Sequence, residues 1–347
     1  MGVTSGAGER QPDERFLVTG ALGCIGAWTV ANLVREGRAV IAFDLGHDRR
    51  RLEALMTPAE LAAVTFVAGD ITDLAHVERT FDEQGVTNVI HLAALQVPFC
   101  RADPPLGALV NVVGTVNLFE AVKRRSERMA PLVYTSSIGM FAATDGDRAT
   151  GRLAEDADAH PASHYGVFKL ANEGTARIYW HESGVSSVGL RPLTVYGAGR
   201  DQGMTRGPPV ALAAAILGLP YTVGFGGRTT FQYAGDVART LIQASRSRLG
   251  GAQVFNLDGD TVDMGEWIAA IEEEIPEAAG RITAAPTELP FPAEIEHAGV
   301  AALGPVVVTP FRDGIRATAQ VYRRLAAEGR LIPAQHGIAV PAPPSPV

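Results

Sequence analysis

Tyr165 and Lys169 stand four residues apart and are the residue types needed for proton transfer. On a helix, positions i and i+4 lie on one face, which places an ammonium beside a phenol. A free phenol has a pKa near ~10 and is a poor base at neutral pH. A nearby cation favours the phenolate and lowers that pKa, so Tyr165 could take a proton from a substrate hydroxyl. Because surface helices give the same spacing by chance, the pair gains weight only from the segments that position it.

A glycine-rich segment near the start of the chain predicts a dinucleotide site. Gly20, Gly23 and Gly26 follow an expected strand and open an expected helix. This spacing permits a tight turn and close approach of the backbone to a pyrophosphate, while the helix N-terminus supplies free N–H groups. Asp44 ends the next strand, where an acid binds the adenosine ribose and repels a 2′-phosphate. We therefore expect NAD, with NADP less favoured, although arginines at 49–51 could blunt that preference or simply begin a solvated helix.

The composition excludes several classes of function. The chain has 347 residues, a net charge of −8 and no long basic run, so we expect no nucleic-acid partner. The longest apolar stretch, about 209–219, is too short for a bilayer, and the N-terminus lacks the apolar core of a signal peptide. Cys24 and Cys100 give no disulfide framework, and the histidines show no ligand spacing, so we expect no metal. These features predict a cytoplasmic protein that acts on a small molecule.

Strands and helices alternate along most of the chain. We expect strands at 15–19, 39–44, 64–68, 88–92, 132–135 and 186–190, with long helices at 106–125 and from 165 to about 181. This order predicts an α/β fold with a Rossmann-type doubly wound parallel sheet. Right-handed crossovers place the carboxyl ends of the strands along one edge, where a ligand should bind.

The domain organisation follows from where this regularity ends. Residues 1–14 form a flexible lead, and 15–191 an NAD-binding Rossmann domain to which 231–258 returns. The segments 192–230 and 259–330 build a smaller, mixed α/β C-terminal lobe that binds substrate. Residues 331–347 form a Pro-rich tail that is extended or disordered.

These motifs together resemble the extended short-chain dehydrogenase/reductase superfamily, the group of nucleotide-sugar epimerases and dehydratases. The resemblance covers about 16–257. The matching segments, beyond the glycines, are 69–71, 91–94, Asn111, 134–137, the Tyr165/Lys169 pair, 191–192 and 195–197. It implies an enzyme in which NAD exchanges a hydride with a carbinol carbon. It also implies a homodimer formed by the helices at 106–125 and at Tyr165.

The resemblance assigns roles to individual residues. Tyr165 exchanges the proton with the substrate oxygen, Lys169 lowers the Tyr165 pKa and binds the nicotinamide ribose, and Ser137 orients the same oxygen, with Ser136 as the alternative serine. The implied cofactor-binding set is Gly20, Gly23, Cys24, Ile25, Gly26, Asp44, Asp70, Ile71, Leu92, Ala93, Ala94, Asn111, Tyr165, Lys169 and Pro192.

Three positions depart from the epimerase pattern. Thr194 stands where epimerases usually carry Asn, and Gln96 where they often carry Lys. Thr229 aligns with the Arg that grips the substrate diphosphate, and Arg228 lies one residue early. In a strand, a shift of one residue turns a side chain to the other face. A nucleotide sugar would then lack the bidentate cation that a diphosphate favours.

We therefore expect an NAD-dependent oxidoreductase that takes hydride from a secondary alcohol of a small polyol, sugar or sugar acid. The substrate-binding candidates are Ser137, Gln96, Thr194 and Arg206, the last for an anionic group. The alternative is a nucleotide-sugar 4-epimerase that retains and recycles NAD. A non-catalytic, nucleotide-sensing member of the fold is less favoured because the Ser, Tyr and Lys are all present.

Overall fold

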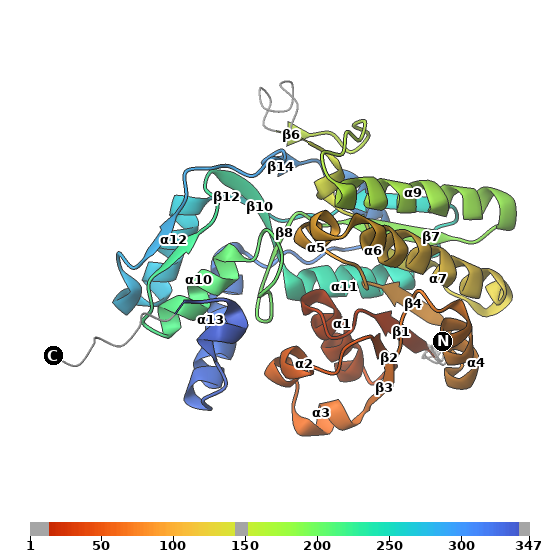
Figure 1. Ribbon diagram of the computed structural model, residues 1–347, viewed down its shortest axis with the longest axis horizontal. Helices are drawn as coiled ribbons and strands as arrows, with labels where there is room; N and C mark the ends of the chain where they lie inside the picture. The colour runs from red at the N-terminus through yellow and green to blue at the C-terminus, as the bar shows by residue number, and fades with distance from the viewer. Residues whose placement is uncertain (1–13, 143–151, 340–347) are drawn as a thin grey trace, which may run out of the picture.

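The computed structural model describes residues 14–142 and 152–339. Seven strands form one parallel sheet in the order β11-β7-β5-β4-β1-β2-β3 (Figure 1). Their bounds are β1 Arg15–Thr19, β2 Ala39–Asp44, β3 Val64–Ala68, β4 Asn88–His91, β5 Leu132–Thr135, β7 Ser187–Arg191 and β11 Ala252–Asn256. The expected doubly wound parallel sheet is confirmed.

The alternation of side chains along the strands builds two cores, one on each face of the sheet. In β1, Phe16 and Val18 join one apolar cluster and Leu17 joins the other. Helices α1 (Cys24–Arg35) and α11 (Ala234–Ser245) contribute to the first cluster, and α4 (Leu74–Gln84), α7 (Gly114–Lys123) and α9 (His164–Ser183) to the second. Helices on both faces bury a parallel sheet and leave its carboxyl edge open for ligands.

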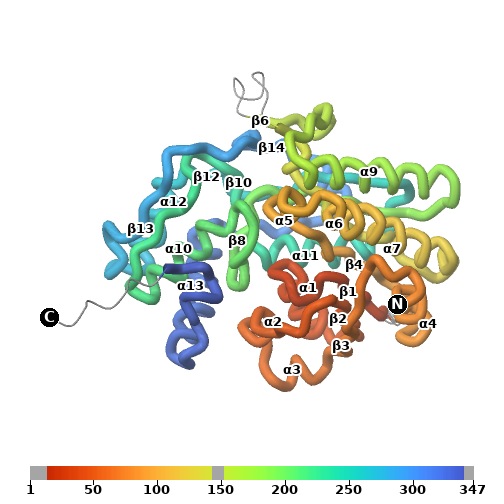
Figure 2. Tube along the Cα trace, in the orientation of Figure 1, coloured from red at the N-terminus to blue at the C-terminus, as the bar shows by residue number. Residues whose placement is uncertain are grey.

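A smaller lobe lies beside the sheet, on the left of Figure 1. Its three-stranded sheet contains β8 (Thr194–Tyr196), β10 (Arg228–Tyr233) and β12 (Asp260–Asp263), and its helices are α10 (Gly207–Ile216), α12 (Met264–Glu274) and α13 (Phe311–Ala327). Fully buried Trp267 stacks on Phe231 with ring centres 4.1 Å apart. The chain leaves the large sheet after β7, returns through α11 and β11, and leaves again. Figure 2 shows α11 beside α1 in the larger part of the molecule, with α12 and α13 in the smaller lobe.

The remaining short elements lie between strands of the large sheet or within the smaller lobe. The helical pieces are α2 (Arg50–Leu55), α3 (Pro58–Ala62), α5 (Val97–Ala102), α6 (Pro104–Ala108) and a π-helical turn, Leu109–Val113. Two strand pairs, β6 (Arg152–Leu153) with β14 (Glu294–Ile295) and β9 (Tyr221–Val223) with β13 (Ile282–Ala284), complete the lobe.

The chain around 331–339 differs from the expected extended tail. A short helix at Pro333–His336 follows Leu331, and Leu331, His336 and Ile338 are all buried. The His336 ring packs edge-on against Tyr322 of α13, with centres 5.6 Å apart. The apolar residues between the prolines dock this segment onto the lobe, so composition alone was misleading. The rest of the tail, and residues 1–13 of the lead, lie outside the described residues.

Among the described residues, one helical stretch, Pro104–Lys123, is long and apolar enough to cross a membrane by length and composition alone. Polar residues such as Asn111 and Thr115 interrupt this stretch, so the sequence shows no continuous apolar run there. Half of it is buried in the fold, where α7 packs against the sheet.

Candidate active site

Tyr165 and Lys169 lie on the first turns of α9, whose start is fixed by Ser163. The Ser163 side chain accepts a 3.1 Å hydrogen bond from the Gly166 amide and caps the helix. Nζ of Lys169 lies 5.6 Å from the centre of the Tyr165 ring. The two residues therefore share one helix face, as their spacing predicts.

The Lys169 ammonium is held by the strand beside it. Its Nζ is buried and donates a 2.6 Å hydrogen bond to the Thr135 carbonyl at the end of β5. Burial lowers the pKa of Lys169 to about 8, because the charged form loses its solvation. Burial also raises the pKa of Tyr165, against the lowering effects of a hydrogen bond with Ser137 and of the Arg200 cation. The expected downward shift of the Tyr165 pKa is therefore wrong for the protein by itself, since desolvation of the phenolate outweighs the nearby positive charge.

The two serines after β5 have different partners. Ser137 hydrogen-bonds to Tyr165, and its Oγ also accepts a 2.9 Å hydrogen bond from the Gly139 amide. Ser136 is fully buried and donates a 2.6 Å hydrogen bond to Oε1 of Glu173. The geometry therefore favours Ser137 as the serine that meets a substrate oxygen beside Tyr165, as expected.

A buried ion pair between Glu173 and Arg191 stabilises this arrangement. Glu173 of α9 lies one turn after Lys169, and its carboxylate accepts hydrogen bonds from Arg191 at 2.8 and 2.7 Å. Arg191 ends β7 and also donates to Oδ1 of Asn256 at the end of β11, at 3.4 Å. The pair therefore ties α9 and the Ser136–Ser137 turn to the carboxyl edge of the sheet.

A cavity of about 600 Å³ lies at that edge, over the glycine loop. Gly20 has φ +66°, and a Cβ there would come within 2.6 Å of the Ala93 amide nitrogen; a Cβ at Gly26 would come within 2.2 Å of the Gly20 carbonyl. Asp44 lines the same cavity, and its carboxylate accepts hydrogen bonds of 3.0 Å from the amides of Leu22 and Gly46. A backbone cradle at a helix N-terminus, followed by a fixed carboxylate, fits the pyrophosphate and ribose of a dinucleotide.

Most of the predicted cofactor residues line this cavity or a smaller one of about 160 Å³ that adjoins it. The large cavity is lined by Gly20, Gly23, Cys24, Ile25, Gly26, Asp44, Asp70, Ile71, Leu92, Ala93 and Ala94. The smaller cavity is lined by Ser137, Tyr165, Lys169 and Pro192, and shares Ile25, Leu92 and Ala94 with the first. The catalytic candidates thus lie together in the smaller cavity, which shares part of its wall with the larger one.

Asn111 was expected to bind cofactor, and the structure places it one layer behind. It is 1% exposed, and its side-chain amide bonds both the amide and the carbonyl of Leu95, at 2.7 and 2.9 Å. It lies in the π-helical turn, where its carbonyl accepts hydrogen bonds from the Asn172 and Thr115 side chains. Asn111 therefore holds the loop that forms the cavity wall.

Some of the predicted substrate-binding residues line the cavities, and others do not. Gln96 lines both cavities, as expected. Thr194 is instead fully buried, with its hydroxyl 2.8 Å from that of Thr229. Arg206 packs instead against Gly337 and donates to the Asp201 carbonyl at 3.2 Å. Thr194 and Arg206, which were expected to bind substrate, line neither of the two cavities, because each is engaged within the lobe.

Sequence reasoning missed Arg200, which lines both cavities. One guanidinium nitrogen donates to the Thr205 hydroxyl at 3.2 Å, while its Nε is buried and has no hydrogen-bond partner within residues 14–142 and 152–339. The available signal was its place between Gly199 and Gly203, both with positive φ, just after the strand that ends beside Tyr165. Such a turn can direct a side chain back over the cavity.

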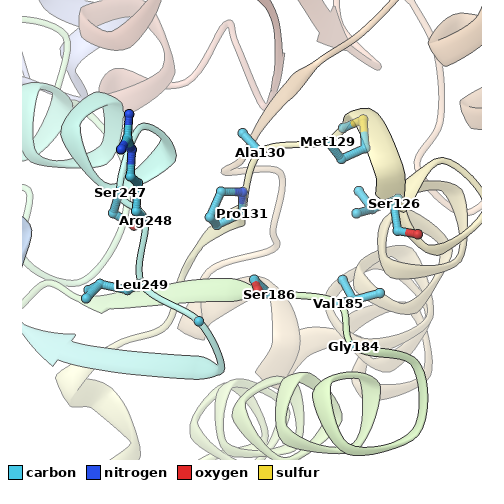
Figure 3. A pocket seen from close by; sticks show the side chains of 12 residues that line it. Ser126, Met129, Ala130, Pro131, Gly184, Val185, Ser186, Ser247, Arg248 and Leu249 are labelled. Atoms are coloured by element: carbon cyan, nitrogen blue, oxygen red, sulfur yellow. The ribbon is translucent and has the colours of Figure 1, made fainter.

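A further cavity of about 250 Å³ lies at the opposite edge of the sheet (Figure 3). It is lined by Pro131 and Ser186, which precede β5 and β7, and by Ser247 and Arg248. None of the predicted chemistry lies there, because the candidate residues follow the carboxyl ends of the same strands. In the part of the chain that the structure describes, no group of three or more His, Cys, Asp or Glu side chains could hold a metal ion.

The chain is similar in sequence and fold to known proteins. The family model of the "NAD dependent epimerase/dehydratase family" matches residues 16–257. UDP-glucose 4-epimerase of Mycolicibacterium smegmatis is 34% identical over 248 residues, or 70% of this chain and 76% of that protein. UDP-glucuronate 4-epimerase 2 of Arabidopsis thaliana is 35% identical over 188 residues, or 52% of this chain and 42% of that protein. The crystal structure of UDP-glucose 4-epimerase of Thermus thermophilus with NAD is 28% identical and superposes with a TM-score of 0.75, covering 89% of this chain and 99% of that one.

The extent of these matches settles the family. The matched region runs from β1 to the end of β11, and so contains the glycine loop, both serines, Tyr165 and Lys169. This chain belongs to the NAD dependent epimerase/dehydratase family.

Proposed function

We propose that this protein is an NAD-dependent epimerase that inverts a secondary-alcohol carbon of a nucleotide-linked hexose or hexuronate. The observation that carries the proposal is that Ser137, Tyr165 and Lys169 lie together in the smaller cavity, which shares wall residues with the dinucleotide-shaped cavity. The relatives named above are UDP-glucose and UDP-glucuronate 4-epimerases, which supports this alternative over the polyol dehydrogenase favoured by the sequence alone.

The chain supplies binding, orientation and proton transfer. NAD, when bound, supplies an acceptor and then a donor for the substrate hydride. Tyr165 takes the proton of the substrate hydroxyl and returns it, and Ser137 holds the same oxygen in place. Lys169, anchored on Thr135, is placed to bind a ribose hydroxyl, and Asp44 to bind the ribose at the other end. Pro192 and Leu193 form part of the wall of the smaller cavity.

A direct test begins with the purified protein. Heat-released cofactor is measured by chromatography, and the protein is then incubated with UDP-glucose, UDP-galactose and UDP-glucuronate while absorbance is followed at 340 nm. The proposal expects co-purifying NAD, interconversion of at least one 4-epimer pair and no net NADH. Net NADH formation with a small sugar or sugar acid, and no interconversion, would overturn it.

One observation favours a second candidate, a dehydrogenase for a small sugar acid. Arg228 is exposed and pairs with Glu294 at 2.8 Å, while Thr229 faces inward onto Thr194. The position that the family resemblance assigns to a diphosphate-binding Arg is therefore occupied by a buried hydroxyl. A diphosphate bound here needs its cation from elsewhere, and a small acid does not need it.

Arg200 supplies a cation for either substrate. Its guanidinium lies over the catalytic cavity with Nε unsatisfied, so an anionic substrate group would complete its hydrogen bonding. We expect Arg200→Gln to lower kcat/KM about 10- to 100-fold, mainly through KM, since a hydrogen bond to a charged group contributes roughly 1.5–3 kcal/mol. Steady-state kinetics check this, with Arg228→Gln as an exposed control that changes little. An unchanged KM for Arg200→Gln would mean that the substrate anion lies elsewhere.

The oligomeric state is proposed to be a homodimer. Exposed apolar side chains gather on the neighbouring helices around Asn111 and on α9: Leu106, Leu109, Val113, Val167 and Ile178. In Figure 1 the segment from α6 to α7 runs alongside α9. Contiguous apolar surface of this kind marks a protein interface. We expect light scattering to give twice the chain mass, and Ile178→Lys to shift the protein to the monomer mass; a wild-type monomer would refute the dimer.

A further inference from the structure

We propose that Asp201 is a second determinant of cofactor choice. This buried carboxylate, from the loop after β8, occupies two arginines beside the ribose end of the cofactor cavity and so excludes a 2′-phosphate. The inference rests on the NAD-binding part of the proposed function and is independent of the substrate. It concerns residues about 150 positions apart, Arg50 and Arg51 on one side and Asp201 on the other.

The contacts of Asp201 use both carboxylate oxygens. Oδ1 accepts hydrogen bonds from Nη2 and Nε of Arg51, at 2.6 and 3.2 Å, and Oδ2 accepts one from Nη2 of Arg50, at 3.0 Å. Asp201 is 3% exposed, and the Arg51 side chain is 11% exposed. Solvent therefore screens the Arg51 pair little, and the three groups form one tightly held cluster.

The cluster lies at the end of the cavity where the ribose is expected. Arg50 and Arg51 line the cavity together with Asp44. Nη1 of Arg51 donates to the Leu22 carbonyl at 2.9 Å, and the amide of the same Leu22 donates to Asp44 at 3.0 Å. Leu22 is therefore hydrogen-bonded both to the Arg51 guanidinium and to the Asp44 carboxylate, which is placed to bind the ribose. An arginine at this place is what a 2′-phosphate requires.

Asp201 decides whether these cations are available. A guanidinium already bound to a buried carboxylate has its charge compensated and its donors occupied, so a phosphate would have to displace Asp201. The third arginine of the run, Arg49, lies over the Phe66 ring with its Cζ 3.6 Å from the ring centre. All three arginines of the 49–51 run are therefore engaged within the protein, two of them by Asp201, and this is consistent with a preference for NAD.

The loop that carries Asp201 is fixed to the cofactor-binding helices. The Ala198 carbonyl accepts a 3.0 Å hydrogen bond from the indole of Trp28 in α1, and the Gly199 carbonyl accepts one of 3.0 Å from Nε of Arg51. The next residue, Arg200, lines the cavity itself. These contacts hold the loop that carries Asp201 against α1 and α2.

The test measures dinucleotide binding to protein freed of cofactor, with no substrate present. Dissociation constants for NAD and NADP are measured by calorimetry for the wild type, Asp201→Asn and the control Glu294→Gln, which removes an exposed carboxylate of the lobe. We expect Asp201→Asn to tighten NADP binding about tenfold, with the NAD constant changed less than about threefold, because the freed guanidinium donors can bind the 2′-phosphate. The control should leave both constants unchanged.

A second variant protects the test against misfolding, since Asp201→Asn leaves Arg51 without its buried partner. Asp201→Asn combined with Arg51→Gln removes that pair as a unit and frees Nη2 of Arg50 for the phosphate, while Nη1 of Arg50 keeps its 3.0 Å ion pair with Asp48. Tighter NADP binding in either folded variant supports the proposal. An unchanged NADP constant in both, or an equal gain for NAD and NADP, overturns it. If the wild type binds neither dinucleotide, this proposal and the cofactor assignment fail together; if it binds NAD but epimerises no sugar, the reaction alone fails.

Discussion

Replacing Tyr165 with Phe is expected to lower kcat/KM by about 10²- to 10⁴-fold, the contribution typical of general acid–base catalysis. The change removes only the hydroxyl that hydrogen-bonds to Ser137 and leaves a ring of the same size in the cavity wall. Cofactor binding should survive, because the glycine loop and Asp44 are untouched. The rate of 4-epimer interconversion and the amount of NAD that co-purifies measure the two expectations separately.

The direction in which kcat/KM changes with pH follows from the pKa of Tyr165. Burial raises the pKa of Tyr165 in the protein without ligands, so the phenol is protonated at neutral pH. Because the base is the phenolate, kcat/KM should rise with pH, and it reports the free enzyme. The hydrogen bond with Ser137 lowers the Tyr165 pKa. Ser137→Ala should therefore move the rise to higher pH, in addition to its loss of rate.

Ser136→Ala is the matched control, because its hydroxyl serves Glu173 and not Tyr165. It should leave the position of the pH profile in place, even though loss of the Glu173 hydrogen bond loosens the turn that carries Ser137 and lowers the rate. A Tyr165→Phe variant that keeps wild-type rates, or a Ser136→Ala variant that shifts the profile as Ser137→Ala does, would show that the proton is handled by another group.

The parts of the fold that could be predicted are those that depend on local pattern. The bounds of β1, β2, β3 and β5 agree with the expected ones, because each is a short apolar run that ends in a turn or helix start. The glycine loop was recognisable for the same reason. Tyr165 and Lys169 needed only helix periodicity to become neighbours.

The parts that could not be predicted depend on partners far along the chain. The Thr135 carbonyl that holds the Lys169 ammonium, and the burial that raises the Tyr165 pKa, exist only once β5 and α9 pack together. The π-helical turn that directs Asn111 onto Leu95 has no signature in residue type alone. Arg200 was overlooked in favour of Arg206 because the two are equivalent in composition and differ only in which way the loop faces.

Replacing Glu173 with Leu is expected to lower the free energy of unfolding by about 3–5 kcal/mol, because it leaves the Arg191 cation buried without its partner. Glu173 is 2% exposed, and its carboxylate accepts from Arg191 and Ser136 together. Urea denaturation measures the change. Glu294→Leu, which breaks the exposed Arg228 pair, should cost no more than about 1 kcal/mol and serves as the control.

Replacing both Glu173 and Arg191 distinguishes the loss of the ion pair from the cost of burying an unpaired Arg191 charge. In Glu173→Leu combined with Arg191→Met, no uncompensated charge remains, so much of the lost stability should return. Activity should not return with it, because Ser136 has still lost the acceptor that fixes the turn carrying Ser137. If the double variant regained activity as well as stability, Ser137 would be held by its own backbone contacts alone. The Glu173–Arg191 pair would then stabilise the fold without positioning the catalytic residues.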